Sequence, residues 1–208
     1  MSEVKTDGNV LFPVFLKLNR IQTLIVGGGL VGHEKVVALL KNDPNANIRL
    51  IAPEVLPQIL ELTRHSKIEI IQRKLRKRDL RGVDLLILAT DNYSLHQQIK
   101  QWARRRHLLT NVADTPDLCD FYLGSTVKKG DLKVGISTNG KSPTFAKRFR
   151  EVLEEILPDS LPELLNQLNG IRNRLKGDFS SKVDRLNEIT SVLVEKNEQD
   201  EDSKTEVL

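Results

Sequence analysis

The sequence predicts an α/β fold, a Rossmann-type doubly wound parallel sheet followed by a smaller helical module. Two observations lead to this fold class. Apolar segments of strand length alternate with segments of helical periodicity through the first half of the chain, and the first apolar segment runs directly into a cluster of glycines. Strands that are apolar throughout belong to parallel sheets that helices cover on both faces.

The expected elements follow one another in regular alternation. Strands are expected at residues 23–29, 47–53, 68–75, 83–90 and 108–114. Helices are expected at residues 30–42, 54–65 and 94–107, where apolar side chains recur every three or four positions. This order of strands and helices is typical of a sheet built from βαβ units.

The rhythm changes after Asp114. A strand is expected at 131–138, and Ser142 with Pro143 is a helix start, with serine as N-cap and proline at the first helical position. A helix over 144–158 follows, and the pattern then predicts helices up to residue 194. We therefore divide the chain into a dinucleotide-binding domain (1–113), a middle region (114–157), a helical module (158–195) and a disordered tail (196–208).

Composition excludes several classes of protein. No apolar run in the 208 residues approaches the roughly 18–20 needed to span a bilayer. The first ten residues lack a signal-peptide pattern, and the single cysteine, Cys119, cannot form an internal disulfide. Cys119 is expected to be a small packing residue. We expect a cytoplasmic protein without a membrane partner.

The glycine cluster raises the first functional hypothesis. Gly27, Gly29 and Gly32 fit the pattern G-x-G-x-x-G between an expected strand and an expected helix. The first glycine allows a tight turn, the second a close approach of a pyrophosphate, and the third close packing of helix on sheet. The alternative is a glycine-rich turn that binds nothing.

The choice between NAD and NADP depends on the end of the second strand. An acidic residue is expected there to accept a ribose hydroxyl, and Glu54 is the only candidate. Glu54 alternatively starts the next helix. No arginine follows immediately to hold a 2′-phosphate. NAD is therefore the expected cofactor.

A second group of polar residues follows the later strands. Asp114 ends an apolar strand and should lie in the crevice, where a carboxylate can take a proton or orient a substrate N–H as hydride leaves. It alternatively caps the following turn. Farther along, Thr138, Lys141 and Ser142 surround a helix start, which suits a substrate rich in carboxylates.

The segments "LIVGGGLVGHEK", "LLILATDN" and "NVADTPDLCDFYLGSTVKKGDLKVGISTNGKSPTFAKRFRE" resemble the precorrin-2 dehydrogenase module of siroheme synthase. The resemblance covers roughly residues 9–195. It implies NAD-dependent oxidation of precorrin-2 to sirohydrochlorin and, in some members, insertion of Fe(II). It also implies a homodimer, with the region after the Rossmann domain as the interface. The methyltransferase domain of three-function enzymes has no counterpart here, so that reaction is expected from another protein.

The resemblance also assigns residues. It makes Asp114 the catalytic aspartate, and the eight carboxylates of precorrin-2 suit the donors around Lys141. The dinucleotide contacts, together with the glycines above, are Gly29, Leu30, Val31, Glu54, Val55 and Thr90.

Two hypotheses from other classes remain. A non-catalytic NAD-sensing module would explain the glycine pattern but leaves Asp114 without a task. Nucleic-acid binding through the basic runs 73–81 and 104–106 lacks interleaved aromatic residues, so no nucleic acid is expected. The four histidines show no metal-ligand spacing, and no permanently bound structural metal is expected.

Overall fold

The computed structural model describes residues 8–175 and 179–190. The predicted tail, 196–208, lies outside these residues. The chain divides into two compact units. The first comprises residues 8–124 and 137–143, and the second comprises residues 125–136 and 144 onward.

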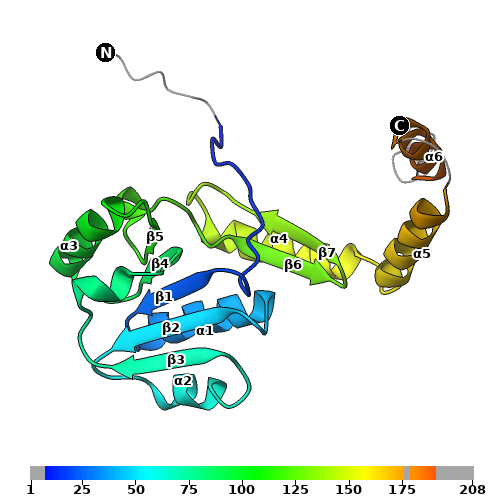
Figure 1. Ribbon diagram of the computed structural model, residues 1–208. Coiled ribbons are helices and arrows are strands. Elements are labelled where there is room, and N and C mark those ends of the chain that lie inside the picture. The colour runs from blue at the N-terminus through cyan, green and yellow to red at the C-terminus, as the bar shows by residue number, and fades with distance from the viewer. Residues whose placement is uncertain (1–7, 176–178, 191–208) are drawn as a thin grey trace. The chain divides into compact units, whose positions relative to one another are not determined.

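The first unit is built on a five-stranded parallel sheet (Figure 1). Its strands lie in the order β3-β2-β1-β4-β5. They are β1 (Gln22–Val26), β2 (Asn47–Ala52), β3 (Ile68–Gln72), β4 (Leu85–Leu88) and β5 (Leu109–Val112). The strand order reverses between β1 and β4, which places the topological switch point of the doubly wound fold there.

Three helices connect the strands. They are α1 (Leu30–Asn42), α2 (Pro57–Leu62) and α3 (Tyr93–Arg104). A short 3-10 helix, η1 (Lys77–Leu80), takes the place of a helix between β3 and β4, and a second one, η2 (Pro116–Leu118), follows β5. Among the described residues, no helix combines the length and the apolar composition of a membrane span.

Both faces of the sheet are covered, as apolar strands require. Ile25 of β1 packs with Val36 and Leu39 of α1, whereas its neighbour Leu24 packs with Ile99 and Ala103 of α3. Leu24 and Ile25 are completely buried. Alternate residues of one strand thus belong to two separate cores, because successive side chains point to opposite faces of a sheet. The predicted fold class is confirmed.

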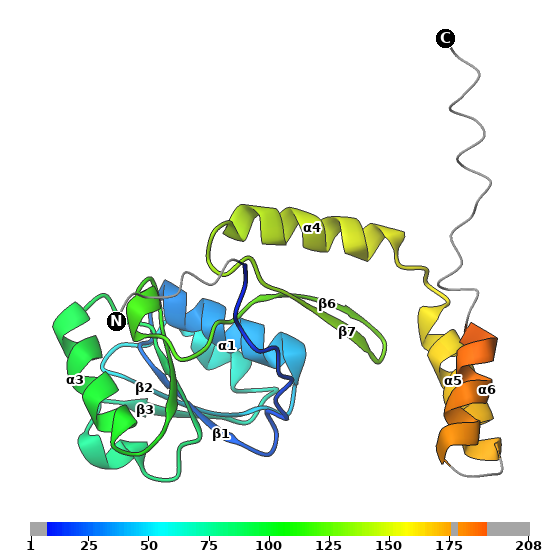
Figure 2. The same cartoon turned by 90° about the horizontal axis from the view of Figure 1, so that it is seen from above.

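The described residues of the second unit form an antiparallel hairpin and three helices. The hairpin pairs β6 (Ser125–Lys129) with β7 (Leu132–Ile136). The helices are α4 (Pro143–Ile156), α5 (Leu161–Arg174) and α6 (Phe179–Thr190). Val127 and Ile136 of the hairpin form a small core with Ala146 of α4. Figure 2 shows α5 and α6 side by side, and contacts join the two helices.

Two local expectations were wrong. The third strand ends at Gln72 rather than 75, because Arg73 forms two hydrogen bonds with the Asp79 carboxylate, 2.7 and 2.8 Å long, and the chain folds back into η1. The second helix occupies Pro57–Leu62 only. Within the region expected to be helical from residue 161, the described helices are α5 and α6.

Candidate active site

The carboxyl edge of the sheet carries most of the predicted site. The strand register pairs Val26 with Ile51 and Leu88, and Leu88 with Val112. The segments that leave these strands therefore start at one level, and they hold the glycine cluster, Glu54, Thr90 and Asp114. Ligands of doubly wound sheets bind at this edge, next to the switch point.

Two of the glycines are required by packing. Gly27 has a φ of +119°, and a Cβ atom on it would lie 2.2 Å from the carbonyl oxygen of Ala89 at the end of β4. A Cβ atom on Gly32 would lie 2.2 Å from the carbonyl oxygen of Gly27. These contacts hold the turn against β4 and α1 against the turn, as predicted for the first and third glycines.

Gly28 is a residue that the sequence analysis missed. A Cβ atom on it would lie 2.3 Å from the carbonyl oxygen of Glu54 and 2.9 Å from Cα of Val55. The carbonyl oxygen of Gly28 accepts a hydrogen bond from the Leu56 N–H, 2.9 Å long. The segment carrying Glu54 is thereby attached to the glycine turn. The run of glycines in "VGGGL" was the available signal.

Gly29 differs from the other three glycines. A Cβ atom built on it has no neighbour within 4 Å, so its backbone faces open space. Gly29 is the N-cap of α1, and no described side chain caps this helix start or places a carboxylate in its first turn. A helix start has N–H groups without intrahelical partners and a positive dipole end. This open, uncapped helix start fits the pyrophosphate of a dinucleotide.

The other predicted cofactor contacts surround this helix start. Leu30 is 79% exposed at the first position of α1, and Val31 is half-buried against the core on the α1 face. Glu54 is exposed in the loop after β2. Since α2 begins only at Pro57, Glu54 does not start that helix.

Thr90 lies on the other side of the glycine turn. Its Cγ2 atom is 3.2 Å from the Cβ position of Gly27, so the side chain is in contact with the turn. Its hydroxyl group is 2.8 Å from Nε2 of His96, a residue of α3 that is only 3% exposed. Burial lowers the pKa of His96, with smaller opposing effects from Thr90 and Asp91.

Asp114 lies two residues beyond the end of β5, with an unusual backbone. Its φ is +55°, a left-handed conformation that aspartate tolerates better than most residues. The side chain is exposed. Asp114 lies within a turn that the backbone closes, because the Thr115 N–H donates to the carbonyl oxygen of Val112. The Asp114 carboxylate makes no hydrogen bond or ion pair with any described residue.

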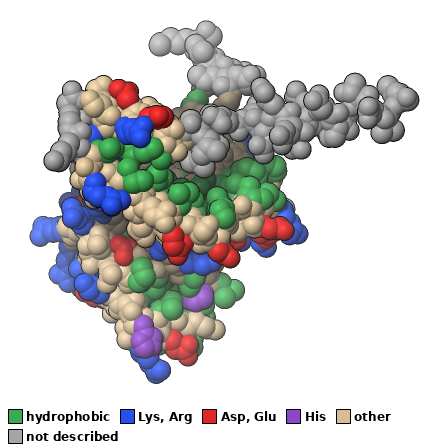
Figure 3. Space-filling model, turned by 90° about the vertical axis from the view of Figure 1, so that its right-hand side faces the viewer, with side chains coloured by type: hydrophobic (Ala, Val, Ile, Leu, Met, Phe, Trp, Pro, Cys, Tyr) green, Lys and Arg blue, Asp and Glu red, His purple; other side chains and the backbone are tan. Residues whose placement is uncertain are grey.

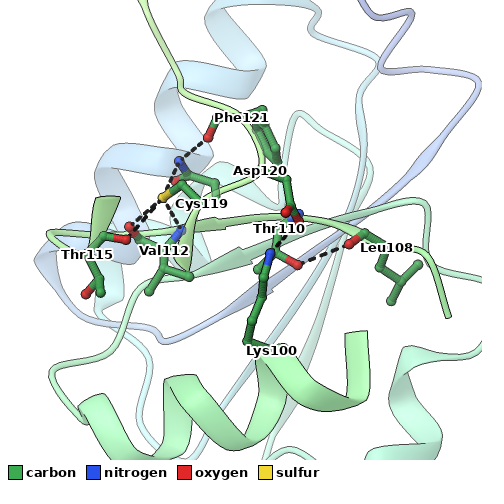
Figure 4. A network of polar contacts seen from close by, with 9 residues as sticks. Lys100, Leu108, Thr110, Val112, Thr115, Cys119, Asp120 and Phe121 are labelled. Atoms are coloured by element: carbon green, nitrogen blue, oxygen red, sulfur yellow. Dashed lines mark hydrogen bonds and ion pairs between the residues drawn. The ribbon is translucent and has the colours of Figure 1, made fainter. Parts of the chain in front are cut away.

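The loop that carries Asp114 is fastened at its base (Figure 4). The Asp120 carboxylate accepts hydrogen bonds from Lys100 of α3 and from the Thr110 N–H, and the Asp120 N–H donates to the carbonyl oxygen of Thr110. The side-chain amide of Asn111 donates to the carbonyl oxygen of Phe121, 2.9 Å away. Both ends of the loop are therefore fixed to β5.

Cys119 is a third attachment within the same loop. Its Sγ atom lies 3.2 Å from both the N–H and the carbonyl oxygen of Val112. Burial raises the pKa of the thiol, which the Val112 N–H and Lys100 partly oppose. A half-buried thiol with a raised pKa is mostly neutral, so Cys119 packs and forms weak hydrogen bonds rather than acting as a nucleophile.

The predicted anion-binding loop is separately organised. The Thr138 hydroxyl accepts a hydrogen bond from the Ser142 N–H (3.1 Å), and the Lys141 N–H donates to the carbonyl oxygen of Thr138 (3.0 Å). The Asn9 amide lies within hydrogen-bonding distance of Ser137. Lys141 is exposed. These hydrogen bonds join residues of the segment 137–142 to one another and to Asn9, and Asp114 takes no part in them.

Among the described residues, no three His, Cys, Asp or Glu side chains are grouped so that they could hold a metal ion.

Comparisons with known proteins agree with this geometry. Residues 14–125 match the family described as "Putative NAD(P)-binding", and residues 129–156 match that described as "Sirohaem biosynthesis protein central". The siroheme synthase of Pseudoalteromonas translucida is 34% identical over 173 residues, which is 83% of this chain and 36% of that protein. The siroheme synthase of Nitrosococcus oceani is 38% identical over 142 residues, 68% of this chain and 30% of that protein. The chain thus spans about a third of the length of these relatives.

A solved structure titled "SirC, precorrin-2 dehydrogenase" matches with a TM-score of 0.69 and 26% sequence identity. The match covers 86% of this chain and 89% of that one. The resemblance drawn from the sequence is confirmed, as is the expectation of a nicotinamide dinucleotide cofactor. Residues 14–125 make up more than half of the chain, so the chain belongs to the family described as "Putative NAD(P)-binding".

Proposed function

We propose that this chain is an NAD-dependent precorrin-2 dehydrogenase that forms sirohydrochlorin. The open, uncapped start of α1 at Gly29 carries the proposal, because a Cβ atom on Gly29 would meet nothing within 4 Å and no described side chain caps this helix start. The likeness to the precorrin-2 dehydrogenase structure along most of both chains supports the choice of reaction.

The residues around the glycine turn bind different parts of NAD. The N–H groups at the start of α1 bind the pyrophosphate, and Gly27 and Gly32 keep that helix start close to the sheet. The exposed Glu54 carboxylate accepts a ribose hydroxyl hydrogen bond, which a 2′-phosphate would not offer. Leu30, Val31, Val55 and Thr90 complete the lining of the cofactor site.

The oxidation removes two hydrogens from the substrate, one as hydride and one as a proton. The bound dinucleotide supplies the hydride acceptor. We assign the proton to the Asp114 carboxylate, which is exposed and makes no hydrogen bond with a described residue. The hydrogen bonds at the base of the loop hold this carboxylate at the carboxyl edge of the sheet, where we propose that the cofactor binds. Fixed positioning of this kind contributes much of the catalytic effect of a general base.

The loop at 137–143 supplies the binding site for the substrate's carboxylates. Lys141 presents an exposed ammonium group, and the start of α4 adds the positive end of a helix dipole. Thr138 and Ser142 order this loop through the hydrogen bond between them. We propose that the substrate's carboxylates bind this loop while its reacting carbon lies beside Asp114.

An anaerobic absorbance assay tests the proposal. Purified protein, precorrin-2 and NAD are expected to yield sirohydrochlorin, and Asp114→Asn is expected to lose this conversion. Asparagine is the preferred replacement because it tolerates the left-handed backbone that Asp114 adopts. Asp117→Asn is the matched control, since Asp117 is an exposed aspartate of the same loop.

The outcomes separate the claims. Conversion by Asp117→Asn but not by Asp114→Asn supports both the reaction and the residue. A folded wild type that binds NAD without converting precorrin-2 refutes the enzyme and favours an NAD-sensing module. Full activity in Asp114→Asn keeps the reaction and removes Asp114 from it.

For a second reaction, insertion of Fe(II) into sirohydrochlorin, we propose the same carboxylate as the acceptor of protons leaving the pyrrole nitrogens. Fe(II) is here a substrate. Adding Fe(II) to the completed assay is expected to give the siroheme spectrum. If the spectrum remains that of sirohydrochlorin both with and without the protein, the proposed chelatase activity is refuted.

We also propose a homodimer formed through α4. Phe145, Phe149, Val152 and Ile156 recur every three or four residues along this helix and are 42–64% exposed. The rings of Phe145 and Phe149 are stacked, with centroids 5.9 Å apart. Figure 3 shows hydrophobic side chains gathered in patches on the face that it draws. Exposed apolar surface marks an interaction site when it forms a continuous stripe. A second copy offers the same stripe, as a two-fold interface requires.

A cytoplasmic location is part of the same proposal. It is supported by the single, unpaired cysteine. Fractionation of cells that produce the protein would test it.

A further inference from the structure

His96 is a buried titratable residue for which the proposed chemistry has no use. It lies on the core-facing side of α3 in line with Ile99 and Ala103 and is only 3% exposed. Its Nε2 atom is 2.8 Å from the hydroxyl oxygen of Thr90. Among the described residues, its Nδ1 atom has no hydrogen-bond partner although it is fully buried. A histidine placed in an apolar row with one idle nitrogen calls for an explanation other than packing.

The hydrogen bond between His96 and Thr90 can run in either direction. If Thr90 donates, Nε2 is the bare nitrogen, and the proton of the neutral ring is on Nδ1 as a buried donor without an acceptor. If Nε2–H donates, the idle Nδ1 is only an unused acceptor. Buried N–H groups without a partner are rarer than buried acceptors without one, so the second arrangement is favoured.

This direction has a consequence for Thr90. Its oxygen accepts the hydrogen bond from Nε2–H, so its own O–H hydrogen is available for another acceptor. Thr90 is only half-buried, and its methyl group contacts the glycine turn beside the start of α1. The hydroxyl therefore lies at the same strand edge as the open backbone of Gly29.

We propose that His96 is a positioning residue that makes Thr90 a dedicated hydrogen-bond donor to an oxygen atom of the bound dinucleotide. The inference rests on the proposed function, since it needs the cofactor at the glycine turn. His96 itself touches neither the cofactor nor the substrate and acts through the Thr90 hydroxyl.

Two replacements separate the hydrogen bond from the packing. His96→Leu fills the site but lacks an N–H donor, whereas His96→Gln retains one at a similar reach. A neutral hydrogen bond contributes little net free energy, so we expect His96→Leu to raise the Kd for NAD by about 3- to 10-fold and His96→Gln to stay within about twofold of wild type. The KM for NAD should rise in parallel while kcat changes little, because the contact is present before and during the reaction.

Thr90→Val should weaken NAD binding to a similar degree, and adding His96→Leu to it should have little further effect, because the two side chains share one interaction. His65→Leu is the matched control, since His65 is an exposed histidine outside this contact. Urea unfolding of each variant shows that it is folded before NAD is titrated by calorimetry.

A spectroscopic test does not depend on catalysis. In the 15N-labelled, NAD-free protein, long-range 1H–15N spectra distinguish a protonated ring nitrogen from a bare one, and comparison with His96→Gln assigns the signals of His96. We expect the proton on Nε2. A proton on Nδ1 would overturn the inference.

The failures are distinguishable. Wild type that does not bind NAD refutes the proposed function itself. Wild type that binds NAD no more tightly than folded His96→Leu or Thr90→Val leaves the proposed function intact and refutes the role of His96. If His96→Leu does not fold, the pair of Thr90→Val and His96→Gln, with the spectrum, still decides the question.

Discussion

Replacing Gly29 or Gly32 by alanine should have opposite consequences, although only two residues separate them. At Gly29 the new methyl group meets nothing within 4 Å, and the φ of −81° suits alanine. Alanine restricts the unfolded chain, which stabilises by about 0.4–1 kcal/mol, and it is a poorer N-cap than glycine by a similar amount. The free energy of unfolding of Gly29→Ala should therefore stay within about 1 kcal/mol of wild type.

At Gly32 the new Cβ atom would lie 2.2 Å from the carbonyl oxygen of Gly27. Because this oxygen belongs to the backbone of the turn, α1 must move. Such overpacking costs about 1–3 kcal/mol. For a chain of this size each kcal/mol lowers Tm by about 2–4 °C.

Gly29→Ala, which should leave stability nearly unchanged, should be the variant that weakens NAD binding. The methyl group of Gly29→Ala occupies the space that the pyrophosphate needs, so NAD should bind at least about tenfold more weakly, a loss of about 1.4 kcal/mol. Urea unfolding and NAD calorimetry on both variants measure the two effects. A Gly29→Ala protein that binds NAD like wild type would place the dinucleotide elsewhere. A Gly32→Ala protein as stable as wild type would refute the packing argument.

Three further predictions follow from other contacts. The Arg73 guanidinium lowers the pKa of Asp79. The stability that the Asp79 carboxylate adds is therefore complete above its ordinary pKa of 3.8 and is lost as the pH falls through the lower pKa of the folded protein. In urea unfolding at different pH values, Asp79→Asn should flatten this acid dependence. If α4 forms the proposed dimer interface, Phe149→Glu should convert that dimer into a monomer in analytical ultracentrifugation, whereas Lys147→Glu should not. Lys100→Met should lower kcat by about tenfold with an unchanged Kd for NAD, since it loosens only the loop base; an unchanged kcat would contradict that role.

The fold was predictable because it depends on local periodicity. Strands buried on both faces, such as Leu85–Leu88, are apolar throughout, and the glycine turn lies between one of them and a helix. The strand Ser125–Lys129 was missed because only Val127 of its five residues is buried. A strand in a two-stranded hairpin outside the main core carries little hydrophobic signal.

The supports of the candidate site were not predictable from local pattern. Lys100 and Asp120 are twenty residues apart in sequence, and only the folded chain brings them together at Thr110. His96 gave a usable signal, because it shares a helical spacing with Ile99 and Ala103 on the apolar side of α3. Its contact with Thr90, however, depends on how α3 leaves the end of β4.

The attachment of Asp120 to Thr110 has a consequence for solubility. β5 is the last strand of the sheet, and unpaired N–H and C=O groups on such an edge invite pairing with another chain. Asp120 forms hydrogen bonds with both the N–H and the carbonyl oxygen of Thr110 on the outer side of β5. Its ion pair with Lys100 adds charged groups at the same place. The loop that holds the proposed catalytic aspartate thus also shields the sheet edge, so variants that release this loop should aggregate as well as lose activity.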